Sequence, residues 1–164
     1  MTGGRLLMSY GDFHTARGYQ LLERHKGGLT PSLEDYLEMI YRSDSQGERV
    51  RINTLATQLN VKPSSVSKMV LKLTQLGFLD YKKYGVISLT EEGREKGAYL
   101  LSRHEIISRF FELLSGEQSE STFVEIELIE HILTEETAHQ IDRLTSFFEE
   151  NKALKSSLKQ YIKG

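Results

Sequence analysis

The sequence predicts a mainly α-helical protein, in which a helix-turn-helix and a small β-hairpin precede an all-helical second part. The sequence shows a short helical pattern, then a tight turn at residues 60–62, then a longer helical pattern. Two short stretches in which apolar and polar residues alternate follow directly. After residue 90 the periodicity is helical throughout. The chain has 164 residues, enough for two small domains, and we place an N-terminal extension at 1–29, a first domain at 30–97 and a second at 98–164.

Composition excludes several classes of protein. Cysteine is absent, so the chain has no disulfide framework, no zinc site of the cysteine type and no cysteine nucleophile. We find no apolar run long enough to cross a bilayer and no secretory signal pattern, so no membrane association is expected. The absence of cysteine suits a cytoplasmic protein, which is the localisation we expect. The net charge of -2 is distributed unevenly. Residues 62–83 carry a local charge of +4, whereas residues 110–141 carry eight acids and no Lys or Arg, which indicates an anion-binding part joined to a cation-binding part.

The first clear helix begins at Thr30-Pro31, where Thr30 is the expected N-cap and proline occupies the first helical position. The pattern continues to Tyr41. Asp35 and Glu38 are three residues apart and share one face, which alone would be read as two ordinary surface acids. The core stripe on another face consists of Leu33, Leu37, Ile40 and Tyr41.

The helix-turn-helix follows a turn at residues 43–48. Asn53 is the expected cap of a helix over residues 54–59, and Pro63 starts a second helix over residues 64–76 that Gly77 ends. Small hydroxyls and lysines on the exposed face of that second helix can contact phosphates and base edges in a major groove. These residues are Ser64, Ser65, Ser67, Lys68 and Lys72.

Residues 78–89 predict two strands joined around residues 83–85. A hairpin directly after a helix-turn-helix is a wing, and Lys82 and Lys83 at its tip can contact a DNA backbone. A structural helical hairpin with a solvated lysine face is the alternative, and the basic wing makes double-stranded DNA the better interpretation.

The second part begins with a capping region at residues 90–93, which starts a helix to about Leu114 that contains His104. Helices over about 121–133, 134–148 and 152–161 are expected after it. In the first of these three, Glu127, Glu130 and His131 stand at i, i+3 and i+4 and project from one face. The neighbouring apolar stripe of Ile126, Ile129, Ile132 and Leu133 predicts a buried surface beside them. Two carboxylates and an imidazole crowded together favour a divalent cation, although a lone string of this kind is more often a solvated acidic face.

Four separated motifs together resemble the diphtheria toxin repressor family, and within it the manganese-responsive members. They are Thr30-Pro31-Ser32-Leu33-Glu34-Asp35-Tyr36-Leu37-Glu38-Met39-Ile40-Tyr41, Pro63-Ser64-Ser65-Val66-Ser67-Lys68-Met69-Val70, Arg103-His104-Glu105 and Ile126-Glu127-Leu128-Ile129-Glu130-His131. The resemblance covers roughly residues 30–161. It implies a homodimeric winged-helix repressor that binds operator DNA only with a divalent metal, and not an enzyme.

The same resemblance implies six metal ligands. They are Asp35, Glu38, His104, Glu127, Glu130 and His131. The iron-sensing branch typically has a Met near position 35 and a Cys in the later helix, and this chain has neither. Donors of oxygen and nitrogen without sulfur suit Mn²⁺ or Fe²⁺ better than tetrahedral zinc, and this many carboxylates could neutralise two cations per subunit.

Three other functions remain open from sequence. The chain could be an iron-responsive regulator of the same family, or a di-metal hydrolase or oxidase with an open coordination position at a substrate pocket. It could also be a winged-helix regulator of an organic ligand, with the acidic cluster as plain surface. A metalloprotease is disfavoured because the second histidine of the zincin motif is missing after His104-Glu105. A ferritin-like di-iron site is disfavoured because its motif places a Glu three residues before a His, and residue 128, three residues before His131, is Leu.

Overall fold

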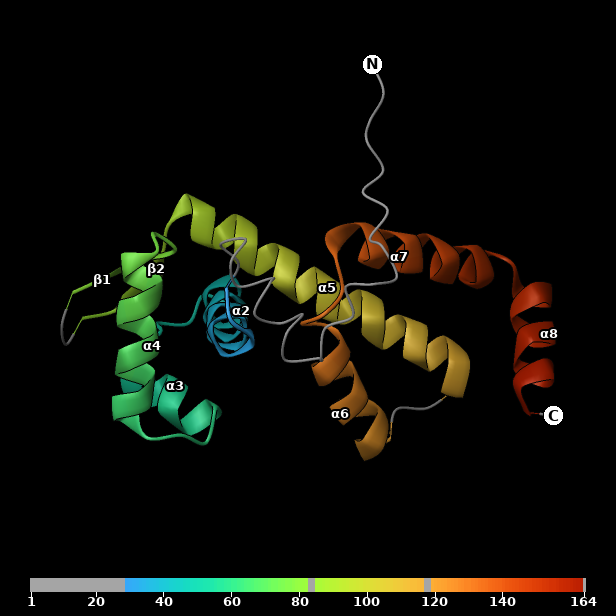
Figure 1. The fold of residues 1–164 in the computed structure, drawn as a ribbon, viewed down its shortest axis with the longest axis horizontal. Helices are drawn as coiled ribbons and strands as arrows, with labels where there is room; N and C mark the ends of the chain where they lie inside the picture. The colour runs from blue at the N-terminus through green and yellow to red at the C-terminus, as the bar shows by residue number, and fades with distance from the viewer. Residues whose placement is uncertain (1–28, 83–84, 117–118, 164) are drawn as a thin grey trace, which may run out of the picture.

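A computed structural model describes residues 29–82, 85–116 and 119–163 of the chain. The predicted N-terminal extension, apart from residue 29, and Lys83 lie outside these ranges. The described residues form seven α-helices and a two-stranded sheet (Figure 1). In chain order these are α2 (Pro31–Ser45), α3 (Ile52–Gln58), α4 (Pro63–Gln75), β1 (Leu79–Tyr81), β2 (Ile87–Leu89), α5 (Glu91–Ser115), α6 (Glu120–Ile129), α7 (Glu135–Glu150) and α8 (Lys152–Lys163).

Helix α2 begins as expected. The Thr30 side chain accepts a hydrogen bond from the Leu33 amide at 3.4 Å, and Pro31 occupies the first turn. The helix runs four residues past the predicted end at Tyr41, to Ser45. Its apolar face is buried in the core of the first domain, which leaves an acidic face of α2 to meet the second part of the chain.

The helix-turn-helix is formed by α3 and α4. The predicted cap at Asn53 is wrong, because α3 begins at Ile52 after an extended Arg51 and therefore includes Asn53 in its first turn. Helix α4 starts at Pro63, and Gly77 follows its end with a φ of 87°, where a side chain would be strained. The core between these helices is fully buried and consists of Leu55, Val66, Val70 and Leu73.

The predicted hairpin is confirmed. Strands β1 and β2 pair antiparallel with Leu79 opposite Leu89 and Tyr81 opposite Ile87. The Ile87 amide also donates to the Val50 carbonyl at 2.9 Å, which ties the hairpin to the segment before α3. The hairpin consequently lies beside α4 at one end of the molecule, in the position of a wing (Figure 1).

Helix α5 connects the two parts of the molecule. The Thr90 side chain caps it by accepting from the Gly93 amide at 3.0 Å. Along the way it crosses α2 closely, since a Cβ placed on Gly97 would lie 2.6 Å from the Cβ of Tyr41. The predicted domain boundary after residue 97 falls inside this helix and stays a prediction.

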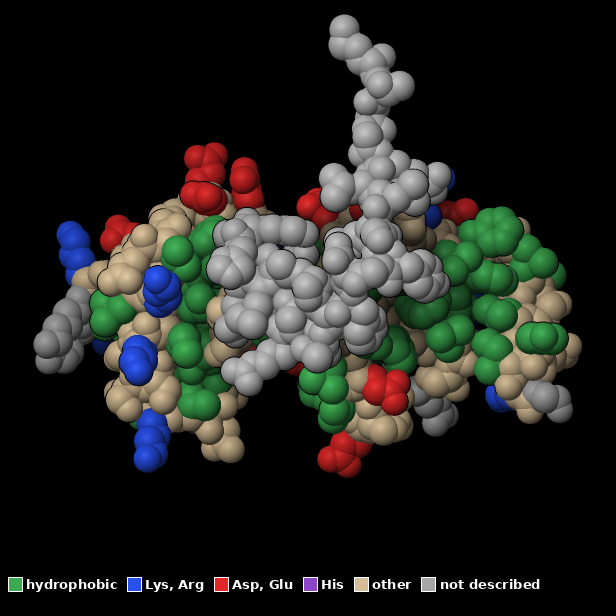
Figure 2. Space-filling model, viewed as in Figure 1, with side chains coloured by type: hydrophobic (Ala, Val, Ile, Leu, Met, Phe, Trp, Pro, Cys, Tyr) green, Lys and Arg blue, Asp and Glu red, His purple; other side chains and the backbone are tan. Residues whose placement is uncertain are grey.

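The helix predicted over residues 121–133 ends early, at Ile129. The amides of Ile132 and Leu133 both return to the Ile129 carbonyl, at 3.0 and 3.3 Å, and the chain turns into α7, which Thr134 caps. Ile132 is therefore 68% exposed, and its assignment to a buried stripe is wrong. Helices α7 and α8 complete the second part and carry exposed apolar side chains (Figure 2).

Candidate metal centre

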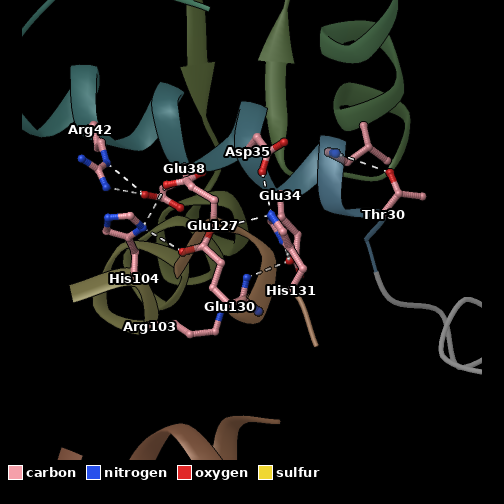
Figure 3. A network of polar contacts seen from close by, with 11 residues as sticks. Thr30, Glu34, Asp35, Glu38, Arg42, Arg103, His104, Glu127, Glu130 and His131 are labelled. Carbon is pink, nitrogen blue, oxygen red and sulfur yellow. Dashed lines mark hydrogen bonds and ion pairs between the residues drawn. The ribbon is translucent and has the colours of Figure 1, made fainter. Parts of the chain in front are cut away.

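The six predicted ligands come together where α2, α5 and α6 meet (Figure 3). Helix α2 contributes Asp35 and Glu38, and α5 contributes His104. Glu127 lies in the last turn of α6, and Glu130 and His131 lie just beyond its end. The early end of α6 matters here, because it sends the His131 ring toward α2 while Glu127 remains beside α5.

One group of three donors contains Asp35, Glu130 and His131, whose donor atoms lie within 4.8 Å of one another. The His131 Nε2 atom is 3.0 Å from Asp35 Oδ1 and 3.7 Å from Glu130 Oε1. This group joins α2 to the turn after α6.

A second group contains His104, Glu127 and Glu130 within the same limit. The Nδ1 atom of His104 is 2.8 Å from Glu130 Oε2 and 3.6 Å from Glu127 Oε1. Glu130 is only 2% exposed and belongs to both groups, with one carboxylate oxygen directed to each. A carboxylate in that position can bridge two cations.

Glu38 lines the same cleft of about 220 Å³ as Asp35, His104, Glu127 and Glu130, but it belongs to neither group of three. Its Oε1 atom accepts two hydrogen bonds from Arg42, at 2.9 Å from Nε and 2.6 Å from the terminal nitrogen. Glu38 therefore has one oxygen paired with a guanidinium and stands at the edge of the second group.

The protonation of the cluster follows from these contacts. Hydrogen bonds to Asp35 and Glu34 raise the pKa of His131 to about 10, against the opposing effect of burial. The hydrogen bond to Glu130 likewise raises the pKa of His104. Burial, followed by the neighbouring Glu130 charge, raises the pKa of Glu127. Without metal, the His131 imidazole therefore carries a proton at neutral pH and partly neutralises the carboxylates, and His104 keeps its proton to a higher pH than an unperturbed histidine.

The donor set fits a divalent cation. Imidazole nitrogens and carboxylate oxygens are typical ligands of Mn²⁺ and Fe²⁺, and the chain has no cysteine to supply a thiolate. A cation binds neutral imidazole, so its binding would replace the protons on His104 and His131.

Three residues of this network were missed from the sequence. Glu34 accepts from His131 Nδ1 at 2.9 Å and from Arg103 at 2.8 Å, and Arg42 pairs with Glu38. Helical spacing of four residues could have predicted the pair of Glu38 and Arg42. No local signal links Glu34 to Arg103, because 69 residues separate them.

The predicted DNA-binding residues that the structure describes lie on α4 and the hairpin, at the other end of the molecule, where basic side chains gather (Figure 2). Ser64, Ser65, Lys68, Lys72 and Lys82 are exposed. Ser67 is half-buried, so less of it can reach a groove, and Lys83 lies outside the described residues.

Two family models match most of the chain. One, described as the iron dependent repressor N-terminal DNA binding domain, matches residues 28–87. The other, the iron dependent repressor metal binding and dimerisation domain, matches residues 90–156. The HTH-type transcriptional regulator MntR of Bacillus subtilis is 39% identical over 134 residues, which are 82% of this chain and 94% of that protein. The MntR of Oceanobacillus iheyensis is 38% identical over 82% of this chain and 90% of its own length.

Solved structures show the same fold. The manganese regulator SloR superposes with a TM-score of 0.63 at 25% identity and covers 73% of this chain. The metal-dependent transcriptional regulator MtsR gives a TM-score of 0.65 at 26% identity, also over 73% of this chain. The match spans 55% of the length of each of these two solved chains, so about half of each has a counterpart here.

Proposed function

The chain belongs to the iron-dependent repressor family, and from this premise we propose that it is a Mn²⁺-responsive transcriptional repressor whose metal centre controls operator binding. One observation carries the proposal: the six candidate ligands come from both parts of the molecule, the DNA-binding domain and the helical second part. Asp35 and Glu38 belong to the domain with the helix-turn-helix, whereas Glu127, Glu130 and His131 belong to the helical second part.

The ligands on α2 and those at the C-terminal end of α6 explain how metal binding and DNA binding would be coupled. A bound cation would supply the positive charge that holds these carboxylates together. Asp35 and Glu38 move with the DNA-binding domain, so their ligation fixes that domain on the second part. This restricts the motion of the two recognition helices in a dimer and sets their spacing for two half-sites.

Two Mn²⁺ ions per subunit are supported by the two donor groups that share Glu130. The second candidate is an iron-responsive repressor, since Fe²⁺ accepts the same donors. The names of the two MntR relatives favour regulation over enzymatic turnover. A di-metal hydrolase or oxidase is therefore disfavoured. A regulator of an organic ligand is disfavoured because the second part of the chain matches a metal binding and dimerisation domain.

Operator DNA and a second copy of the chain are the partners we propose. The serines and lysines of α4, with Lys82 on the hairpin, supply the DNA surface. Exposed apolar side chains on α6, α7 and α8 supply a surface that a second copy can cover. They include Phe123, Val124, Leu128, Leu144, Phe147 and Leu154.

Among the described residues, no helix combines the length and the apolar character needed to cross a membrane. The proposed site of action is the cytoplasm, because the MntR relatives are named as transcriptional regulators and we propose that this chain likewise acts on DNA.

The test is a pair of reciprocal titrations, of Mn²⁺ with and without operator and of operator with and without Mn²⁺. Coupling is reciprocal, so each ligand should tighten the other by the same factor, commonly worth about 1–3 kcal/mol. Asp35→Ala and Glu130→Ala remove donors from the two different parts of the molecule, and both should weaken Mn²⁺ binding and metal-stimulated operator binding.

Glu105→Ala is the matched control, because it removes an exposed acid next to His104 that belongs to neither donor group. It should keep the wild-type coupling. Equal operator affinity in chelator and in saturating Mn²⁺ would refute the metal-dependent repressor and favour a regulator of an organic ligand.

A further inference from the structure

Glu34 contacts the candidate ligand His131 without belonging to either donor group. One of its carboxylate oxygens, Oε2, accepts hydrogen bonds from His131 Nδ1 at 2.9 Å and from Arg103 at 2.8 Å (Figure 3). The Glu34 and His131 side chains are 12% exposed and that of Arg103 is 4% exposed. This oxygen therefore joins α2, α5 and the turn after α6 in a nearly dry environment.

The contact to Nδ1 determines what the other imidazole nitrogen can do. When Glu34 accepts the Nδ1 proton, the neutral ring of His131 presents the Nε2 lone pair, and Nε2 faces Asp35 and Glu130. A carboxylate on the far nitrogen of a ligating histidine fixes its tautomer and ring orientation and makes the ligand more basic.

Arg103 holds the carboxylate in place. It is buried on α5 and its guanidinium carbon lies 5.7 Å from the centre of the Tyr99 ring. Its terminal nitrogen donates to Glu34 Oε2 at 2.8 Å, and the guanidinium also interacts with the Tyr99 side chain, so Arg103 is held from two sides while it orients the carboxylate. Burial alone would raise the pKa of Glu34, but the hydrogen bonds from His131 and Arg103 lower it, so the carboxylate stays ionised.

We propose that Glu34, oriented by Arg103, is a positioning residue of the metal centre, which holds His131 with Nε2 directed at the cation. The inference rests on the proposed function, because it assigns a role toward the same cation. Glu34 binds no metal in this assignment. It acts through His131, and it adds a contact between α2 and the second part that exists before metal arrives.

The test compares Glu34→Ala with Glu34→Gln. Alanine removes the partner of Nδ1, whereas glutamine keeps an oxygen acceptor but loses the charge. Loss of such an outer partner lowers metal affinity by about 10–100-fold, so we expect that loss for Glu34→Ala and a smaller loss for Glu34→Gln in Mn²⁺ titrations. Glu48→Ala, which removes an exposed acid in the turn after α2, should bind Mn²⁺ like the wild type.

A second readout separates positioning from a merely structural role. With the diamagnetic probe Cd²⁺ bound, the ¹⁵N spectrum of His131 should show a protonated Nδ1 and a ligated Nε2 in the wild type. Glu34→Ala should lose that fixed tautomer, and Glu34→Gln should retain it in part.

Wild-type Mn²⁺ affinity and an unchanged His131 tautomer in both variants would overturn the inference, even if thermal stability fell. If Glu34→Ala fails to fold, wild-type affinity and tautomer in Glu34→Gln alone would overturn it. Absence of Mn²⁺ and Cd²⁺ binding by the wild-type protein would instead overturn the proposed function, so the two failures are distinguishable.

Discussion

Metal binding should release protons, and its affinity should rise steeply with pH. In the metal-free protein, hydrogen bonds to Asp35 and Glu34 hold the pKa of His131 at about 10, well above its usual value of 6.5. The raised pKa means that the protonated ring stabilises the metal-free fold fully below pH 6.5. This stabilisation is lost as the pH rises through about 10. A cation requires the neutral ring, so it competes with that proton across the whole window.

The magnitude follows from the width of the window. Each pH unit below the pKa changes the neutral fraction tenfold, which is worth about 1.4 kcal/mol. From pH 6.5 to 8.5, His131 alone should therefore lower the dissociation constant of Mn²⁺ by about 100-fold. Protonated His104, whose pKa is also raised, adds to the slope while the pH is below its own pKa.

Calorimetric titration of Mn²⁺ in buffers of different ionisation enthalpy measures the number of protons released. The His131→Gln variant should release one proton fewer and show a shallower slope, whatever its absolute affinity. His139→Gln is the control, since its ring is 67% exposed and belongs to neither donor group. A dissociation constant that is flat between pH 6.5 and 8.5, without proton release, would refute the reasoning.

Three further changes test other parts of the molecule. Arg42→Ala should tighten Mn²⁺ binding by about two- to fivefold in direct titration, because the guanidinium no longer competes for Glu38. Lys68→Ala should weaken operator binding and reduce the slope of log K against log salt by about 0.9, while Mn²⁺ affinity stays unchanged. Gly97→Ala should lower the free energy of unfolding by about 1–3 kcal/mol in urea, because the new Cβ meets Tyr41 at 2.6 Å. Wild-type Mn²⁺ affinity in Arg42→Ala, wild-type operator binding and salt slope in Lys68→Ala, or a wild-type free energy of unfolding in Gly97→Ala would contradict the respective prediction.

The sequence alone determined most of the elements, because their ends are set by nearby residues. Thr30 and Pro31 start α2, Pro63 starts α4, and Thr90 caps α5, each through a hydrogen bond or a proline ring within a few residues. The failures were also local. The N-cap of α3 depends on how the chain enters that helix, and the end of α6 on how it turns into the next one, and periodicity specifies neither.

The six candidate ligands could be identified from the sequence through the family resemblance, but their division into two groups could not. That division depends on the turn after Ile129, which directs His131 toward α2 and leaves Glu127 beside His104. The contacts of Glu34 with His131 and Arg103 could not be predicted from the sequence either. Helical spacing states which side chains share a face of one helix. The distance between faces of different helices is decided by core packing, here by the close crossing of α2 and α5 at Gly97.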